Sequence, residues 1–129
     1  MIDFSQPVLV VDDLKTMTRI VDSMLRKCGF KNIEQVNDGK TALQRLKSEL
    51  FLFVVADGEM PEMTGLELLG QVRAQSNFSG IPFIVMSANT EARYAKAAMA
   101  AGANAFLTKP FSLTTLQDVL KQLLQPSQG

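Results

Sequence analysis

The stretch FVVADGEMPEMTG, residues 53–65, runs a short hydrophobic segment directly into an aspartate. Residues 53–56 are all apolar, Asp57 follows them, and Glu59 and Glu62 come soon after. A continuously apolar segment of this length is typical of a strand that is buried on both faces of a parallel sheet. The stretch therefore predicts a buried strand that ends in a carboxylate with further acids around it, and such an arrangement needs a chemical reason.

Short apolar segments alternate with longer amphipathic ones along the whole chain. The predicted strands are residues 8–11, 33–36, 53–56, 83–86 and 105–108. The predicted helices are residues 16–27, 41–50, 66–74, 91–101 and 113–124. This alternation predicts the α/β class, with a doubly wound, five-stranded parallel sheet and five helices that cover both of its faces.

The first predicted helix has one apolar stripe, formed by Ile20, Val21, Met24 and Leu25, which we expect to face the sheet. Cys28 is the single cysteine, so the chain cannot form an internal disulfide. We expect Cys28 to be a small core residue, and its lack of a pairing partner indicates a reducing, cytoplasmic environment.

Length and composition limit the possible functions. A chain of 129 residues can form one hydrophobic core, so we expect a single domain over residues 1–129 with a frayed tail at 125–129. The formal net charge is zero, which gives no indication of a nucleic-acid partner. No apolar run approaches the roughly 20 residues of a membrane helix, and the N-terminus does not resemble a secretory signal, so no membrane partner is expected.

The chain contains no histidine. It cannot form a histidine-based catalytic triad, a histidine metal site or a phosphohistidine of its own. Any phosphoryl chemistry must use a carboxylate or a hydroxyl of this chain, and any histidine must come from a partner.

Polar residues follow the apolar segments of four predicted strands, where ligands bind in open α/β sheets. They are Asp12 and Asp13, Asp57, Ser87, and Lys109. A single aspartate after a strand is usually a turn or a helix cap, but five matched polar residues at one end of a sheet indicate a site. Clustered carboxylates repel one another, and oxygen ligands without cysteine or histidine favour Mg²⁺, with Lys109 balancing charge and Ser87 donating to a phosphate oxygen. The pattern predicts a phosphoryl group carried by an aspartate.

The motifs VDDLKTMTRIVDSML, DGEMPEMTGLELL, SANT and TKPF together resemble the receiver domains of two-component response regulators, and most of all the single-domain, CheY-like receivers. The resemblance covers essentially the whole chain. It implies a flavodoxin-like fold with strand order 2-1-3-4-5, and a cis Lys109–Pro110 bond.

The resemblance also assigns roles to individual residues. Asp57 matches the phosphoacceptor, which takes a phosphoryl group from the phosphohistidine of a sensor histidine kinase. Asp12 and Asp13, with Asp57 and the main-chain carbonyl of Glu59, match the Mg²⁺ ligands. Ser87 matches the serine or threonine that contacts the phosphoryl group, and Lys109 matches the family's lysine, which neutralises charge on the transferring group.

Phosphorylation is expected to pull Ser87 inward and repack Phe106, which alters the surface formed by the fourth helix, fifth strand and fifth helix. A downstream effector reads that surface, the output is expected to be of the chemotaxis or motility type, and a phosphatase is a further partner. The chain itself is expected to have only intrinsic autophosphorylation and autodephosphorylation chemistry and to be no enzyme.

Four positions depart from the chemotaxis pattern: Phe106 replaces a tyrosine, Gly58 a tryptophan, Glu59 an asparagine and Asn89 an acid. The last three border the path of the attacking water, so the lifetime of the phosphoryl group is expected to differ. We expect the side chain of Glu59 to lie at the rim, near Asn89 and within reach of Arg93, where it tunes the site.

Two alternatives remain open at this point. One is a Mg²⁺-dependent phosphohydrolase that uses Asp57 as nucleophile and Glu59 as acid or base, which turnover of a small phosphomonoester would reveal. The other is a receiver-like docking module that is never phosphorylated, which an acid-labile phosphate on Asp57 would exclude.

Overall fold

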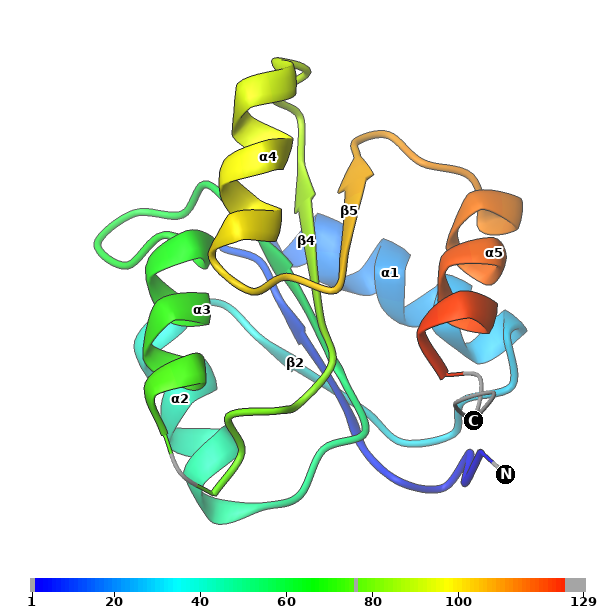
Figure 1. Ribbon diagram of the computed structural model, residues 1–129. Helices are drawn as coiled ribbons and strands as arrows, with labels where there is room; N and C mark the ends of the chain where they lie inside the picture. Colours follow the sequence, from blue (N-terminus) through cyan, green and yellow to red (C-terminus); the bar gives the residue numbers. More distant parts are fainter. Residues whose placement is uncertain (1, 76, 125–129) are drawn as a thin grey trace, which may run out of the picture.

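The computed structural model describes residues 2–75 and 77–124, in which strands and helices alternate (Figure 1). The strands are β1 (Val8–Val11), β2 (Ile33–Val36), β3 (Val54–Asp57), β4 (Phe83–Ser87) and β5 (Ala105–Thr108). The helices are α1 (Lys15–Lys27), α2 (Gly39–Ser48), α3 (Gly65–Ala74), α4 (Ala92–Ala100) and α5 (Leu113–Leu124).

All strand pairs in the sheet are parallel, and the strand order is β2-β1-β3-β4-β5. This confirms the predicted fold class and the flavodoxin-like order. Because every strand runs in the same direction, the sheet has an amino end, where the strands begin, and a carboxyl end, where they finish. The prediction that residues 125–129 form a frayed tail lies outside the described residues.

Two hydrophobic clusters cover the two faces of the sheet. Leu9 and Val11 of β1 belong to the cluster beneath α2, α3 and α4, whereas Val8 and Val10 belong to the cluster beneath α1 and α5. The same alternation holds along β3 and β4, as the two-residue period of a strand requires. Figure 1 shows α2 and α3 on one side of the strands and α1 and α5 on the other. Burial on both faces explains why these strands are continuously apolar in the sequence.

Two predicted details of the helices are wrong. In α1 the buried positions are Thr18, Val21 and Leu25, whereas Ile20 is 45% exposed. Positions 18, 21 and 25 lie three and four residues apart and share one helix face, and Ile20 lies outside it. Helix α2 ends at Ser48 rather than residue 50, which leaves Leu50 76% exposed.

Helix α2 also begins earlier than predicted, at Gly39. Asp38 caps it, because its carboxylate accepts a hydrogen bond from the backbone N–H of Thr41. Cys28 packs against the cluster beneath α1 and α5, and burial raises the pKa of its thiol. No helix in the described part of the chain combines the length and the hydropathy that crossing a membrane would require.

The guanidinium of Arg73, on α3, binds the segments that lead into β4 and β5 at the amino end of the sheet. It donates to the carbonyl oxygens of Ser79, Ile81 and Gly102 at distances of 2.6 to 3.1 Å. It also donates to the side-chain oxygen of Asn104, which accepts the N–H of Phe83. Arg73 therefore ties α3 to both strands through neutral oxygen atoms.

Candidate functional site

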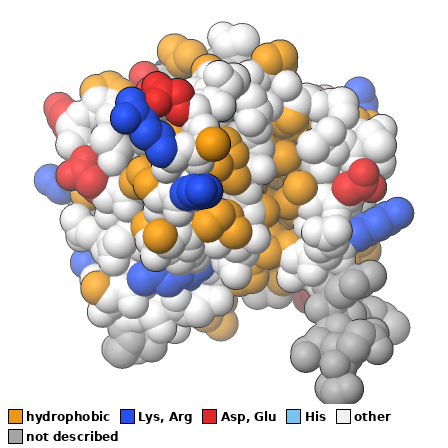
Figure 2. All heavy atoms as spheres, turned by 45° about the horizontal axis from the view of Figure 1, so that its top comes forward, with side chains coloured by type: hydrophobic (Ala, Val, Ile, Leu, Met, Phe, Trp, Pro, Cys, Tyr) orange, Lys and Arg blue, Asp and Glu red, His pale blue; other side chains and the backbone are white. Residues whose placement is uncertain are grey.

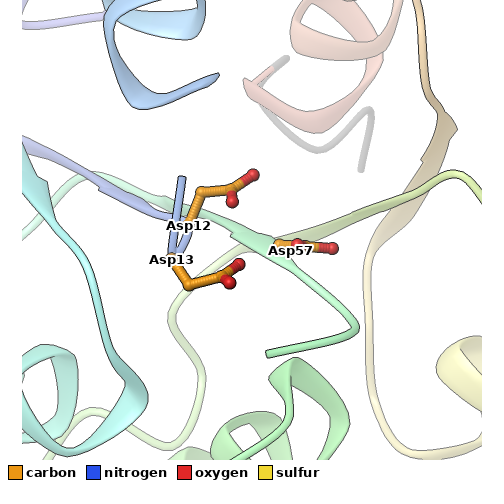
Figure 3. A group of neighbouring side chains, drawn as sticks. All are labelled: Asp12, Asp13 and Asp57. Atoms are coloured by element: carbon orange, nitrogen blue, oxygen red, sulfur yellow. The ribbon is translucent and has the colours of Figure 1, made fainter. Parts of the chain in front are cut away.

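Three carboxylates meet at the carboxyl end of the sheet. One ligand atom each from Asp12, Asp13 and Asp57 lies within 4.8 Å of the others. Asp12 and Asp13 follow β1, and Asp57 is the last residue of the adjacent β3, so the pairing of these strands brings the acids together. Figure 3 shows the three side chains pointing to the same side of the strand ends. Asp12 and Asp57 are buried, which makes the cluster costly unless it is compensated.

Lys109, which follows β5, supplies part of that compensation. Its Nζ donates to Oδ2 of Asp12 at 2.9 Å and lies 3.3 Å from Oδ2 of Asp57. Burial by itself would lower the pKa of Lys109, but the hydrogen bond to Asp12 and the charge of Asp57 outweigh burial and raise the pKa. Lys109 therefore stays protonated and faces both acids. The Lys109–Pro110 bond is cis, as the resemblance implied.

The negative charge of the Asp57 carboxylate is only partly compensated by neighbouring groups. Burial raises the pKa of its carboxyl above the ordinary value, and the neighbouring charge of Asp12 adds to this rise. A hydrogen bond from the backbone N–H of Glu59 and the charge of Lys109 offset only part of it. One lysine thus faces three clustered carboxylates, and the site has unmet attraction for a further cation.

Gly65 allows α3 to begin immediately behind Asp57. A Cβ at this position would lie 2.1 Å from the carbonyl oxygen of Asp57, which is closer than any side chain can approach. The N–H of Gly65 donates to the carbonyl of Gly58, and Thr64 and Glu67 form a capping box that fixes the helix start. The segment after β3 is thereby held rigidly behind the carboxylate.

The side chain of Glu59 reaches across the site to Ser87. The Ser87 hydroxyl, at the end of β4, donates to Oε1 of Glu59 at 2.6 Å and accepts the N–H of Asn89. Glu59 is thus bonded to the hydroxyl that also accepts the N–H of Asn89, as expected, whereas Arg93 pairs with Glu91. Ser87 is fully buried and makes its bond to Glu59 rather than to the Asp–Lys cluster.

Gly58 faces Tyr94, which the sequence did not single out. A Cβ at Gly58 would lie 2.2 Å from the Tyr94 hydroxyl oxygen, so the phenol fills the space that a larger residue at 58 would need. The signal available in the sequence was the glycine itself, since a missing side chain beside a buried strand leaves room for a large neighbour.

The Tyr94 hydroxyl is the one buried side-chain polar atom without a hydrogen-bond partner among the described residues. Burial, followed by the charges of Glu59 and Asp57, raises the pKa of Tyr94. The nearby Ser87 hydroxyl offsets part of this rise, although no hydrogen bond joins the two oxygens. The ring of Tyr94 packs edge-on against Phe106 of β5, with centroids 5.9 Å apart.

The donor set fits a hard divalent cation. The three clustered groups offer carboxylate oxygens only, and neither histidine nor cysteine is among them. Such ligands suit Mg²⁺, which binds through a few carboxylates and keeps several water molecules. Burial, with a smaller contribution from the charge of Asp12, raises the pKa of Asp57, and a bound cation would favour the charged carboxylate there.

Comparisons with known proteins agree with this geometry. The family model of the response regulator receiver domain matches residues 8–121. Chemotaxis protein CheY-3 of Vibrio cholerae is 39% identical over 118 residues, which cover 92% of this chain and 91% of that protein.

Two solved structures have the same fold. The structure of chemotaxis response regulator CheY4 of Vibrio cholerae has a TM-score of 0.84 and 32% identity, covering 93% of this chain and 99% of the other. The receiver domain of a sensor histidine kinase from Pseudomonas aeruginosa, with a magnesium ion coordinated in its active site cleft, has a TM-score of 0.83 and 28% identity, covering 92% and 97%. This chain therefore belongs to the response regulator receiver domain family and is a CheY-like member of it.

Proposed function

We propose that this protein is a stand-alone phosphoreceiver, in which Asp57 accepts a phosphoryl group from the phosphohistidine of a sensor kinase. The single observation that carries the proposal is the group formed by Asp57, Asp12 and Lys109, with Nζ shared between two buried acids. A carboxylate at the end of a rigid strand, with a lysine beside it, is arranged to attack a phosphorus atom and to neutralise the charge on its oxygens.

In the proposed transfer, an Asp57 carboxylate oxygen attacks phosphorus in line with the phosphorus–nitrogen bond of the phosphohistidine. That bond breaks, and its electron pair returns to the imidazole nitrogen of the kinase. Lys109 and the Ser87 hydroxyl are placed to bind the oxygens of the transferred group. Water later cleaves the acyl phosphate, which ends the signal without making the chain an enzyme that turns over an external substrate.

Mg²⁺ would be held by the carboxylates of Asp12, Asp13 and Asp57 and by the main-chain carbonyl of Glu59. When bound, it supplies positive charge to the phosphoryl oxygens. The magnesium ion in the active site cleft of the Pseudomonas aeruginosa receiver supports this assignment.

The proposed output is binding of a downstream effector to the face formed by α4, β5 and α5, in a chemotaxis-type pathway of the cytoplasm. Met99 of α4 is 46% exposed, and Lys96 on the same helix is also exposed. In Figure 2, where the top of Figure 1 comes forward, hydrophobic side chains show between scattered basic and acidic ones. A mixed surface of this kind suits a reversible protein contact.

Labelling with radioactive acetyl phosphate tests the proposal and separates it from the two alternatives. We expect Mg²⁺-dependent incorporation of a phosphate that hydroxylamine removes, as it does from acyl phosphates, and no incorporation in EDTA. Rapid turnover of a small phosphomonoester would indicate a hydrolase instead. The absence of any labelling, from acetyl phosphate or from a phosphorylated kinase, would indicate a docking module.

A further inference from the structure

The buried Tyr94 hydroxyl has no hydrogen-bond partner among residues 2–75 and 77–124, and this requires an explanation. Tyr94 lies on α4, and its hydroxyl oxygen is inaccessible to solvent. A buried donor without an acceptor destabilises a folded protein, and native structures keep few of them. Each such group in a native structure needs a specific explanation.

The candidate acceptor for the Tyr94 hydroxyl is the carboxylate of Glu59. The negative charges of Glu59 and Asp57 both act on the Tyr94 hydroxyl, and Glu59 has the larger effect. In the present state Glu59 is already bonded, because Ser87 donates its single hydroxyl proton to it. The Ser87 oxygen also accepts the N–H of Asn89, which leaves one of its lone pairs unused, but no hydrogen bond joins it to the Tyr94 hydroxyl among the described residues.

A phosphoryl group on Asp57 would compete with Glu59 for that proton. Ser87 cannot donate to both, so a turn of its hydroxyl toward the phosphoryl oxygen removes the donor from the Glu59 carboxylate. An anionic carboxylate beside a newly arrived dianion then needs another donor. The hydroxyl of Tyr94 packs over Gly58, which lies in the chain between Asp57 and Glu59, and the negative charges of both acids raise its pKa.

We propose that Tyr94 is a positioning residue: its hydroxyl donates a hydrogen bond to the Glu59 carboxylate when the Ser87 hydroxyl turns to the phosphoryl group. This inference rests on the proposed function, since it describes the phosphorylated state of the same site. The exchange moves one hydrogen bond from β4 to α4 and transfers no proton. Because the Tyr94 ring packs against Phe106, the exchange also connects the site to β5 and to the surface of α4.

Tyr94→Phe tests the exchange because it removes only the hydroxyl and keeps the ring against Phe106. Without phosphoryl mimic, the variant should melt at a higher temperature than the wild type, because an unpaired buried hydroxyl is lost. With Mg²⁺ and beryllium fluoride, which mimics a phosphoryl group on a carboxylate, it should bind the mimic roughly tenfold more weakly, the cost of a hydrogen bond to a charged group. A lower melting temperature with unchanged affinity would reduce Tyr94 to a packing residue.

Thr18→Val is the matched control for the melting experiment. Thr18 is also a buried hydroxyl, but it is bonded to the carbonyl of Lys15 at 2.9 Å. Its removal should lower the melting temperature and leave the affinity for beryllium fluoride unchanged. Opposite changes in melting temperature for Tyr94→Phe and Thr18→Val would show that the missing hydrogen-bond partner of Tyr94 causes the stabilisation. An increase of similar size in both variants would overturn that explanation.

The near-ultraviolet spectrum gives a direct readout, because Tyr94 is the single tyrosine and the chain has no tryptophan. Beryllium fluoride should shift the tyrosine band to longer wavelength in the wild type, as happens when a phenol donates to a carboxylate. The shift should be absent in Glu59→Ala, and Tyr94→Phe should weaken binding of the mimic much less in a Glu59→Ala background. A shift that persists without Glu59 would overturn the exchange. If fluorine NMR shows that the wild type binds no beryllium fluoride at all, the proposed function itself is wrong, and the exchange falls with it.

Discussion

At the amino end of the sheet, the guanidinium of Arg73 donates to three carbonyl oxygens and one amide oxygen. At the carboxyl end, three carboxylates cluster and one lysine contacts two of them, while a buried hydroxyl has no partner in the part of the chain that the structure describes. Both ends bury charge, but the first satisfies it with the chain's own atoms and the second does not. We infer from this difference that the amino end stabilises the fold, whereas the carboxyl end is suited to bind an additional group. Residual charge is where a cation and a phosphoryl group can bind.

Removal of the Arg73 guanidinium should give the largest change in stability. Arg73→Met leaves the carbonyls of Ser79, Ile81 and Gly102 without their donor, and we expect the free energy of unfolding to fall by about 3 kcal/mol. Urea denaturation measures this loss. Labelling of the folded protein by acetyl phosphate should stay within about twofold of the wild type, because Arg73 lies at the other end of the sheet.

Arg26→Met is the control for that substitution. Arg26 forms an exposed pair with Asp22 four residues earlier on α1, and pairs of this kind contribute roughly 0.5 kcal/mol or less. An equal loss of stability in both variants would contradict the view that Arg73 holds the amino end together.

Gly65→Ala tests how tightly the carboxyl end is built. A Cβ there would collide with the Asp57 carbonyl at 2.1 Å, so the backbone that carries the carboxylate must move. We expect a loss of about 2 kcal/mol, as for other overpacked sites, together with slower labelling. Gly70→Ala in the same helix meets nothing within 4 Å and should stabilise the protein by about 0.5–1 kcal/mol, with labelling unchanged. Equal behaviour of the two variants would show that the site tolerates movement of Asp57.

Asp57→Asn should stabilise the unphosphorylated protein, whereas Arg73→Met should destabilise it. Burial raises the pKa of Asp57, so the folded state binds its proton more tightly than the unfolded chain does. In the wild type, this contribution to stability is therefore present below the ordinary value of 3.8 and is lost as the pH rises through the raised pKa. The asparagine variant lacks this loss, so its melting temperature at neutral pH should be higher by about 3 °C. Asp118→Asn, at an exposed position of α5, should have no effect. A melting temperature of Asp57→Asn below that of the wild type would contradict the view that the carboxyl end carries unrelieved charge.

Glu59→Asn should give the smallest change. In the wild type, Glu59 accepts the Ser87 hydroxyl at 2.6 Å, so under the proposed function it competes with a phosphoryl group for that donor. A neutral amide is a weaker acceptor, so we expect severalfold faster labelling and a severalfold change in the decay of the phosphorylated protein. Glu62→Gln, which removes an exposed acid from the same loop, should leave both rates unchanged. Identical rates in Glu59→Asn and the wild type would make Glu59 a simple loop acid.

The sequence predicted the fold and the acidic cluster because both depend on short-range patterns. Strands such as Val8–Val11 are apolar throughout, and Asp12 and Asp57 reach the same end of the sheet because adjacent parallel strands must finish together. The order of the strands came from the resemblance to known receivers rather than from periodicity.

The contacts that distinguish the two ends could not be predicted in this way. Ser87 and Glu59 are 28 residues apart, and their bond depends on the path of the loop after β3. Arg73 reaches Gly102 across 29 residues through a long, flexible side chain. The position of Tyr94 over Gly58 depends on how α4 packs on the sheet. The sequence pattern of α4 does not predict the position and orientation of this helix relative to the strand ends.

The most direct test of the central claim is to identify the residue that carries the phosphoryl group. The protein should be treated with acetyl phosphate and Mg²⁺, and the modification mapped by mass spectrometry in the wild type and in Asp57→Asn. We predict one added phosphoryl group on Asp57 in the wild type and none in the variant. A phosphoryl group on another residue, or full labelling of Asp57→Asn, would contradict the account.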